Sequence, residues 1–174
     1  MINEAKIINQ PYSGQYEERI YDIPSSWDSQ KWTWIKFSNE DFSEWCGEFR
    51  GSSRYVAISK KHNSILVLTS DYLYQLDRIS GELIEYESQP QYHNLTLTPS
   101  GDFIISDYYS IELIKSTIKE KQLIESPIHM DMIKFHSWSN NELLITCEEF
   151  LNWDRHVELE LNCETLEITM KNDI

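Results

Sequence analysis

The chain has 174 residues and a mass of 20.7 kDa, a length that suits a single domain over 1–174. Hydrophobic residues make up 40% of it and aromatic residues 13%, which excludes a wholly disordered chain. Its 29 acidic and 15 basic residues give a formal charge of −14, which argues against binding nucleic acid or an anionic membrane through a broad basic face.

Residues 1–50 form an aromatic-rich N-terminal segment. Its bulky rings crowd into the second half, at Trp27, Trp32, Trp34, Phe37, Phe42, Trp45 and Phe49. Residues 32–37 alternate as a strand does, whereas Ser38 followed by Asp41 predicts the start of a short helix that ends at Gly47. We therefore expect an α+β segment whose rings cover exposed sheet edges.

The rest of the chain contains an internal repeat of about 40 residues. Three repeats align, at about 55–87, 93–125 and 132–170. Each begins with a short alternating strand, and Ile58, Leu97 and Phe135, taken as one column, are 39 and 38 residues apart. A polar turn follows at Asn63 or Gly101 in the first two repeats, where these residue types accept positive φ at low cost. The repeat therefore predicts a tight hairpin at a fixed offset.

Three further strands complete each repeat. A continuous apolar run, expected to be buried on both faces, is followed by a half-exposed alternating strand and, after a second turn, by a fourth strand. The apolar runs are 65–68, 103–105 and 143–145, and the alternating strands are 72–76, 111–114 and 157–161. Four antiparallel strands in about 40 residues are typical of a propeller blade.

Residues 65–84 resemble a blade of a β-propeller of the quinoprotein or WD-repeat type, and residues 97–105 resemble the inner hairpin of another. The Trp-Asp pairs at 27–28 and 153–154 lie outside the strand end where WD repeats carry theirs, and the resemblance implies no cofactor residues. Closed propellers have four to eight blades. We therefore expect a mainly β fold, in which three consecutive four-stranded antiparallel propeller-like units form a partial propeller packed with the N-terminal segment. An open partial propeller and half of an oligomeric ring are the alternatives, and the oligomeric state stays open.

The ends and the cysteines indicate a cytoplasmic protein. The N-terminus has no basic start followed by an apolar run, and no run of 18 apolar residues occurs. The three cysteines Cys46, Cys147 and Cys163 fit free thiols in a reducing compartment. In such a chain the glycosylation triplet at 94–96 is a chance match.

Motifs for catalysis or metal binding are missing from the sequence. The five histidines pair with no other histidine or cysteine at a metal-binding spacing, and no G-x-S-x-G, P-loop or G-x-G-x-x-G occurs. Cys46 would lie at a helix C-terminus, which raises the pKa of a thiol. We expect a protein that is not an enzyme and takes no cofactor or metal. An enzyme with convergent carboxylates in a central pocket is the remaining catalytic alternative.

The charge is most one-sided in residues 126–174, where ten acidic residues face three basic ones. The third repeat also carries an insertion, residues 148–156, which mixes carboxylates with aromatic rings as protein interfaces do. The expected partner-binding residues are Glu148, Glu149, Phe150, Trp153, Asp154, Glu158 and Glu160, together with Tyr108 and Tyr109. The alternative is a solvated acidic face with the rings packed inward.

In size, acidity and lack of catalytic motifs the chain is similar to immunity proteins of contact-dependent growth inhibition systems. That resemblance implies a bacterial inhibitor that neutralises a basic, nuclease-type toxin by blocking its active-site cleft. Carboxylates would stand in for phosphates there and speed association. The alternative is a propeller-like scaffold or adaptor in a protein complex, because a fold alone does not determine function.

Overall fold

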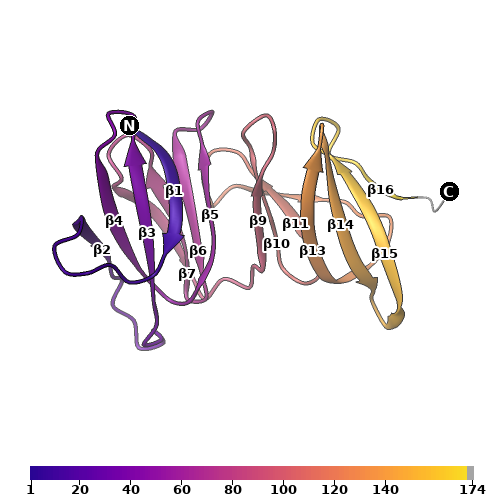
Figure 1. The fold of residues 1–174 in the computed structure, drawn as a ribbon. Helices are drawn as coiled ribbons and strands as arrows, with labels where there is room; N and C mark the ends of the chain where they lie inside the picture. Colours follow the sequence, from indigo (N-terminus) through magenta and orange to yellow (C-terminus); the bar gives the residue numbers. More distant parts are fainter. Residues whose placement is uncertain (172–174) are drawn as a thin grey trace. The chain divides into compact units, whose positions relative to one another are not determined.

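The computed structural model describes residues 1–171, apart from the side chain of Trp153 (Figure 1). These residues form sixteen strands in four four-stranded sheets, and none of them is helical. No helix long and apolar enough to cross a membrane is therefore present in the described chain. The mainly β prediction is confirmed. The chain divides into two compact units, residues 1–90 and 91–174, which are described separately below as the first and second unit.

The N-terminal sheet of the first unit contains β1 (Ile2–Ile8), β2 (Glu17–Tyr21), β3 (Trp32–Asn39) and β4 (Glu44–Arg50). Its order is β1-β3-β4-β2, and β2 pairs with β4 in parallel whereas the other neighbours are antiparallel. Sequence analysis did not predict β2. Its only partner strand is β4, so it lies at the edge of the sheet.

The predicted α+β character of residues 1–50 is wrong. Where the helix was expected, β3 and β4 form a hairpin whose turn places Phe42 at φ 66°. The reason is a contact across the hairpin. Phe37 pairs with Trp45, and the two rings stack with centroids 4.4 Å apart. This cross-strand contact outweighs the local capping signal at Ser38.

The second sheet of the first unit contains β5 (Ser53–Ser59), β6 (Ser64–Thr69), β7 (Tyr72–Asp77) and β8 (Leu83–Ser88), in that order and antiparallel. Side chains from both sheets make one buried cluster. It includes Ile2, Tyr21, Ile35, Phe37, Trp45, Phe49, Ile65, Val67, Tyr72, Tyr74 and Leu76. Tyr21, Phe37, Trp45 and Phe49 of the N-terminal segment thus contribute to a core between two sheets, whereas Trp27 and Phe42 are exposed.

The second unit repeats the arrangement with two antiparallel sheets. The first contains β9 (Asn94–Leu97), β10 (Phe103–Ser106), β11 (Ile111–Ile114) and β12 (Lys121–Ile124). The other contains β13 (Met130–Ser139), β14 (Glu142–Glu149), β15 (Asn152–Asn162) and β16 (Ile168–Met170). Both sheets contribute to one apolar cluster, including Ile104, Leu113, Ile133 and Leu159. The prediction of four-stranded antiparallel sheets is confirmed.

Two details of the third repeat differ from expectation. In the first two repeats Ile58 and Leu97 pair with the first residue of the apolar run. In the third repeat the residue in that position is Trp138 and not Phe135. The pairing of β13 with β14 is irregular at two places, where β13 contains extra residues. A fixed spacing between repeats does not predict these residues. The insertion 148–156 extends β14 and β15, which continue through it to a turn where Leu151 has φ 65°.

A candidate partner-binding surface

Four aromatic rings form a continuous row in the second unit. His93 stacks on Tyr108 with centroids 3.9 Å apart, and Tyr109 lies edge-on to Tyr108 at 6.3 Å and to Phe150 at 6.0 Å. The two tyrosines come from the β10–β11 turn, whereas Phe150 comes from the β14–β15 turn. The structure therefore brings together three residues that the sequence had placed in two separate groups.

The β10–β11 turn holds its tyrosines outward. One carboxylate oxygen of Asp107 accepts hydrogen bonds from the main-chain N–H of Tyr109 and of Ser110, each at 2.7 Å. This short-range turn leaves Tyr108 38% exposed and Tyr109 56% exposed. Phe150 is 45% exposed. These three rings are therefore not packed inward.

Tyr109 and Phe150 border a hollow of about 590 Å³, named here the aromatic hollow. A further wall is the segment 123–130, which begins in the edge strand β12 and includes Glu125 and Pro127. None of the described residues that line the hollow is a lysine or an arginine. Sequence analysis missed this wall; its one signal was Pro127, which follows the last strand of the repeat and indicates an extended connection.

Three of the five predicted carboxylates are paired with a lysine or an arginine. Glu149 accepts hydrogen bonds from Asn152 at 2.9 Å and from Arg155 at 3.0 Å, and these bonds lower the pKa of its carboxyl group. Lys171 lies 3.9 Å from Glu158 and 3.5 Å from Glu160. The remaining two members of the predicted set behave differently.

Glu148 lies 3.7 Å from a ring nitrogen of His156. Asp154 is exposed and forms no ion pair within residues 1–171. Trp153 belongs to β15 by its backbone, but its side chain lies outside the described part of the chain. Asp154 is therefore the predicted carboxylate that is most available to a partner.

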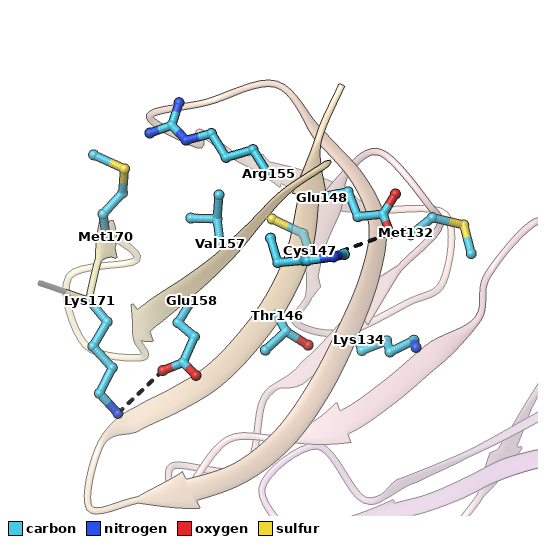
Figure 2. Close-up of a pocket in the computed structure, with 11 residues that line it drawn as sticks. Met132, Lys134, Thr146, Cys147, Glu148, Arg155, Val157, Glu158, Met170 and Lys171 are labelled. Carbon is cyan, nitrogen blue, oxygen red and sulfur yellow. Dashed lines mark ion pairs between the residues drawn. The ribbon is translucent and has the colours of Figure 1, made fainter. Parts of the chain in front are cut away.

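A second hollow, of about 600 Å³, lies on the sheet of β13–β16 (Figure 2). It is lined by residues of both charge signs: Lys134, Glu148, Arg155, Glu158 and Lys171 are among them. Figure 2 shows Lys171 reaching Glu158 at its border. It shares no lining residue with the aromatic hollow. The predicted site thus divides into an aromatic part and a charged part.

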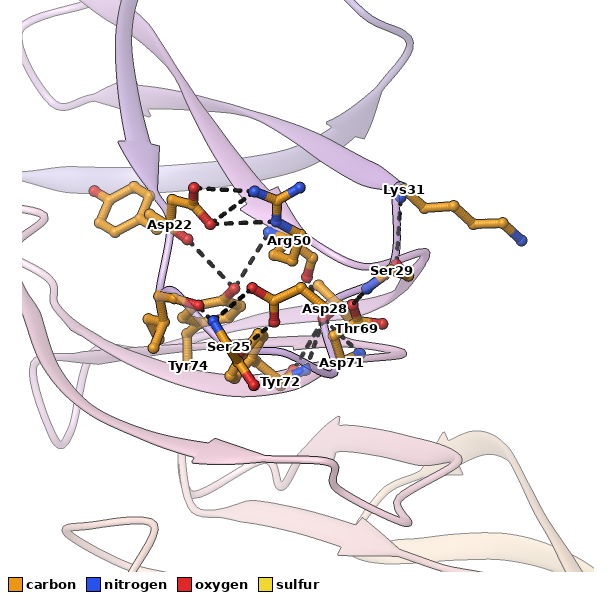
Figure 3. A network of polar contacts seen from close by, with 12 residues as sticks. Asp22, Ser25, Asp28, Ser29, Lys31, Arg50, Thr69, Asp71, Tyr72 and Tyr74 are labelled. Carbon is orange, nitrogen blue, oxygen red and sulfur yellow. Dashed lines mark hydrogen bonds and ion pairs between the residues drawn. The ribbon is translucent and has the colours of Figure 1, made fainter.

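A polar cluster in the first unit anchors the loop between β2 and β3 (Figure 3). The Asp71 carboxylate accepts a hydrogen bond from the main-chain N–H of Ser29 at 2.7 Å, and the Tyr72 hydroxyl donates to the carboxylate of Asp28. Burial and that bond raise the pKa of Tyr72 to about 12. Arg50 binds Asp22 at 2.9 Å. Each of these groups has its partner within the cluster, whose role is to hold the loop.

The described residues contain no group of three His, Cys, Asp or Glu side chains able to hold a metal ion. Cys46 lies buried in β4 and not at a helix end as expected, and burial, with the nearby Glu48 and Glu18, raises its thiol pKa to about 11. Burial raises the pKa of Cys147 to about 11 as well. Both thiols are therefore protonated, and poor nucleophiles, at neutral pH.

Comparisons with known proteins give little to add. No protein-family model matches the chain, and no curated protein matches it. Among solved structures, the N-terminal domain of Nup159 is similar, with a TM-score of 0.47 and 11% sequence identity over 71% of this chain. The chain spans 34% of that structure's chain. The surface described above is therefore the basis for a proposed function.

Proposed function

We propose that this protein is a non-enzymatic, acidic binding protein that neutralises a basic protein, an inhibitor of a nuclease-type toxin. The observation that carries the proposal is the exposed pair of rings, Tyr109 and Phe150, beside a hollow without lysine or arginine among its described lining residues. Tyrosine and tryptophan are enriched among the residues that dominate protein–protein affinity, and such residues cluster in pockets at the centre of an interface.

Charge supports a basic partner. The second unit holds 15 acidic and six basic residues, a formal charge of −9, against −5 for the first unit. A field of this sign attracts the cationic surface with which a nuclease holds its substrate, and it accelerates the encounter at low salt.

The paired carboxylates are compatible with this role. The Arg155–Glu149 pair and the Lys171 pairs are solvent-exposed, and such pairs contribute about 1 kcal/mol or less. Glu149, Glu158 and Glu160 can therefore exchange their own cations for those of a partner at low cost. In this proposal they contribute mainly to steering, and the aromatic rings contribute the contact energy.

A propeller-like scaffold in a larger complex is the second candidate. It is favoured by the large apolar side chains that the first unit also exposes, at Tyr12 (87%), Trp27 (79%) and Phe42 (92%). A scaffold needs more than one binding surface, whereas an inhibitor needs one. The number of partners therefore distinguishes the two candidates.

The first experiment is a pull-down of the tagged full chain from lysate of the source cells, at low and at high salt, with the retained proteins identified by mass spectrometry. We expect one stoichiometric basic partner whose retention falls as salt rises. The purified partner is then assayed for nuclease activity with and without this protein. Several partners, or a complex insensitive to salt, would support the scaffold instead. A basic partner that stays active when bound would refute the inhibitor.

A further inference from the structure

We propose that the aromatic hollow binds an arginine side chain of the basic partner, an inference that rests on the proposed function. The candidate occupants of such a hollow are distinguished by ring geometry, by charge and by the chemistry of its walls.

The rings are placed to receive a planar cation. Tyr109 and Phe150 meet at an interplanar angle of 85°, and both keep about half of their surface exposed. A guanidinium over the face of either ring, within about 6 Å of the centroid, is attracted by the negative charge of that face. The same chain uses this contact elsewhere, because the guanidinium of Arg50 lies 3.8 Å from the ring centroid of Trp32.

Charge selects a cation for this hollow. Glu125 lines it, is exposed, and has no hydrogen bond or ion pair within residues 1–171. A free carboxylate offers two oxygens to the parallel N–H groups of a guanidinium. The other hollow is lined by Lys134, Arg155 and Lys171 beside Glu148 and Glu158, so an incoming arginine would meet charges of both signs there.

The walls favour arginine over lysine. Leu123, 53% exposed, and the partly buried Ile128 present apolar surface against which the aliphatic stem of an arginine can lie. Arginine stacks on rings and is less strongly hydrated than the ammonium of lysine, so it loses less on entering a partly apolar site. The volume of about 590 Å³ exceeds one side chain and leaves space for the residues that flank the arginine.

The test is a nuclear magnetic resonance titration of the full chain with the blocked tripeptide acetyl-Gly-Arg-Gly-amide. Its counterparts carry lysine or citrulline, the neutral isostere of arginine. We expect saturable shifts of the signals of Tyr109, Leu123, Glu125 and Phe150 with the arginine peptide. We expect binding about tenfold weaker with citrulline, because the charge-assisted bonds are lost. Equal binding of the citrulline peptide, or shifts elsewhere in the chain, would overturn the inference.

Glu125→Gln tests the carboxylate and keeps the shape of the side chain. It should weaken arginine binding by about three- to tenfold. Glu142→Gln, another exposed carboxylate of the second unit, should leave it unchanged. Equal effects of the two variants would also refute the assignment. If the pull-down yields a basic partner but the peptide does not bind, the arginine inference fails and the proposed function survives. If the peptide binds but no basic partner is found, the proposed function fails instead.

Discussion

The side-chain amide of Asn94 donates a hydrogen bond to the main-chain carbonyl of Ile133, at 2.9 Å, and so joins the two sheets of the second unit. The same amide group donates to Ser106 at 2.8 Å, and its oxygen accepts from the N–H of Phe135 at 3.2 Å. Asn94 is 6% exposed. Because its amide is buried and bonded, the glycosylation triplet that begins there is inaccessible, in agreement with the sequence interpretation.

Replacing Asn94 by Ala should lower the free energy of unfolding by about 2–4 kcal/mol, because the Ile133 carbonyl and the Phe135 N–H are left without partners. Chemical denaturation followed by circular dichroism measures the loss. Gln122→Ala, at an exposed position of β12, is the control and should change stability by about 0.5 kcal/mol or less. Equal stability of the two variants would contradict the role of Asn94.

A comparison of two glycines with positive φ distinguishes the cost of backbone strain from the cost of steric crowding. A Cβ at Gly51 (φ 103°) would lie 2.7 Å from the Thr69 hydroxyl and 2.8 Å from the main-chain nitrogen of Asp71. A Cβ at Gly14 (φ 78°) would meet nothing within 4 Å. We expect Gly14→Ala to cost about 1 kcal/mol and Gly51→Ala about 3 kcal/mol or more. Thermal melting of both variants measures the difference, and similar melting temperatures would show that crowding at Gly51 is relieved.

The first unit should lose stability in alkali. Burial raises the pKa of Tyr21 and of Tyr72 to about 12, and it raises that of Tyr74 as well. An unfolded tyrosine ionises near pH 10, so between pH 10 and 12 the unfolded chain loses protons that the folded chain keeps. The stabilising contribution is therefore complete below pH 10 and falls as pH rises. Tyr72→Phe should lower the proton release on unfolding by up to about one proton between pH 10 and 12, measured from the pH dependence of the unfolding free energy.

Sequence analysis predicted the sheets well because their signal is local. The apolar runs at 65–68, 103–105 and 143–145 lie in β6, β10 and β14. It failed where contacts between residues that are distant in the sequence determine the secondary structure. The stacking of Phe37 on Trp45 forms a hairpin where the capping signal at Ser38 predicts a helix, and β2 is a short charged edge strand with little apolar pattern.

Sequence analysis named Tyr109 and Phe150, two of the rings at the aromatic hollow, but predicted neither their contact nor the wall at 123–130. Tyr109 and Phe150 are 41 positions apart, and their contact depends on how the two sheets of the second unit pack. Nothing in the sequence links Glu125 to either ring, because the three come from different connections between strands. Local patterns identify exposed aromatic turns, whereas the hollow between them is a property of the fold.

The ring pair gives the most direct prediction about binding. The double variant Tyr109→Ala, Phe150→Ala should weaken the partner complex by about 10- to 100-fold, as expected for two central aromatic contacts. Tyr12→Ala, at an 87% exposed ring of the first unit, is the matched control and should bind normally. Isothermal titration calorimetry with the purified partner measures both. An unchanged affinity of the double variant would move the contact surface elsewhere.

The acidic hairpin of β14 and β15 predicts a graded response to acid. The hydrogen bonds from Asn152 and from Arg155 lower the pKa of Glu149. The stabilising effect of these bonds is therefore present above the ordinary glutamate pKa, and it disappears as pH falls through the lowered value. Asn152→Ala and Arg155→Ala should each raise that pKa, because each removes a hydrogen bond to the carboxylate and Arg155→Ala also removes a positive charge. Carbon-13 titration of the Glu149 carboxyl measures both shifts, and an unchanged pKa in either variant would contradict this account.

The position of β2 imposes an order on how the nascent chain folds. Residues 17–21 leave the ribosome before β3 and β4, yet they pair only with β4. Tyr21 stacks on Phe49 at 4.5 Å, and its hydroxyl donates to the carbonyl of Gly81 at 2.6 Å. The segment therefore stays unpaired until β4 has been synthesised, and it joins the two sheets of the first unit only once Gly81, 60 residues after Tyr21, has followed. As a short strand at the edge of its sheet, β2 should open more readily than the central strands β3 and β4, and we expect its amide protons to exchange faster than theirs.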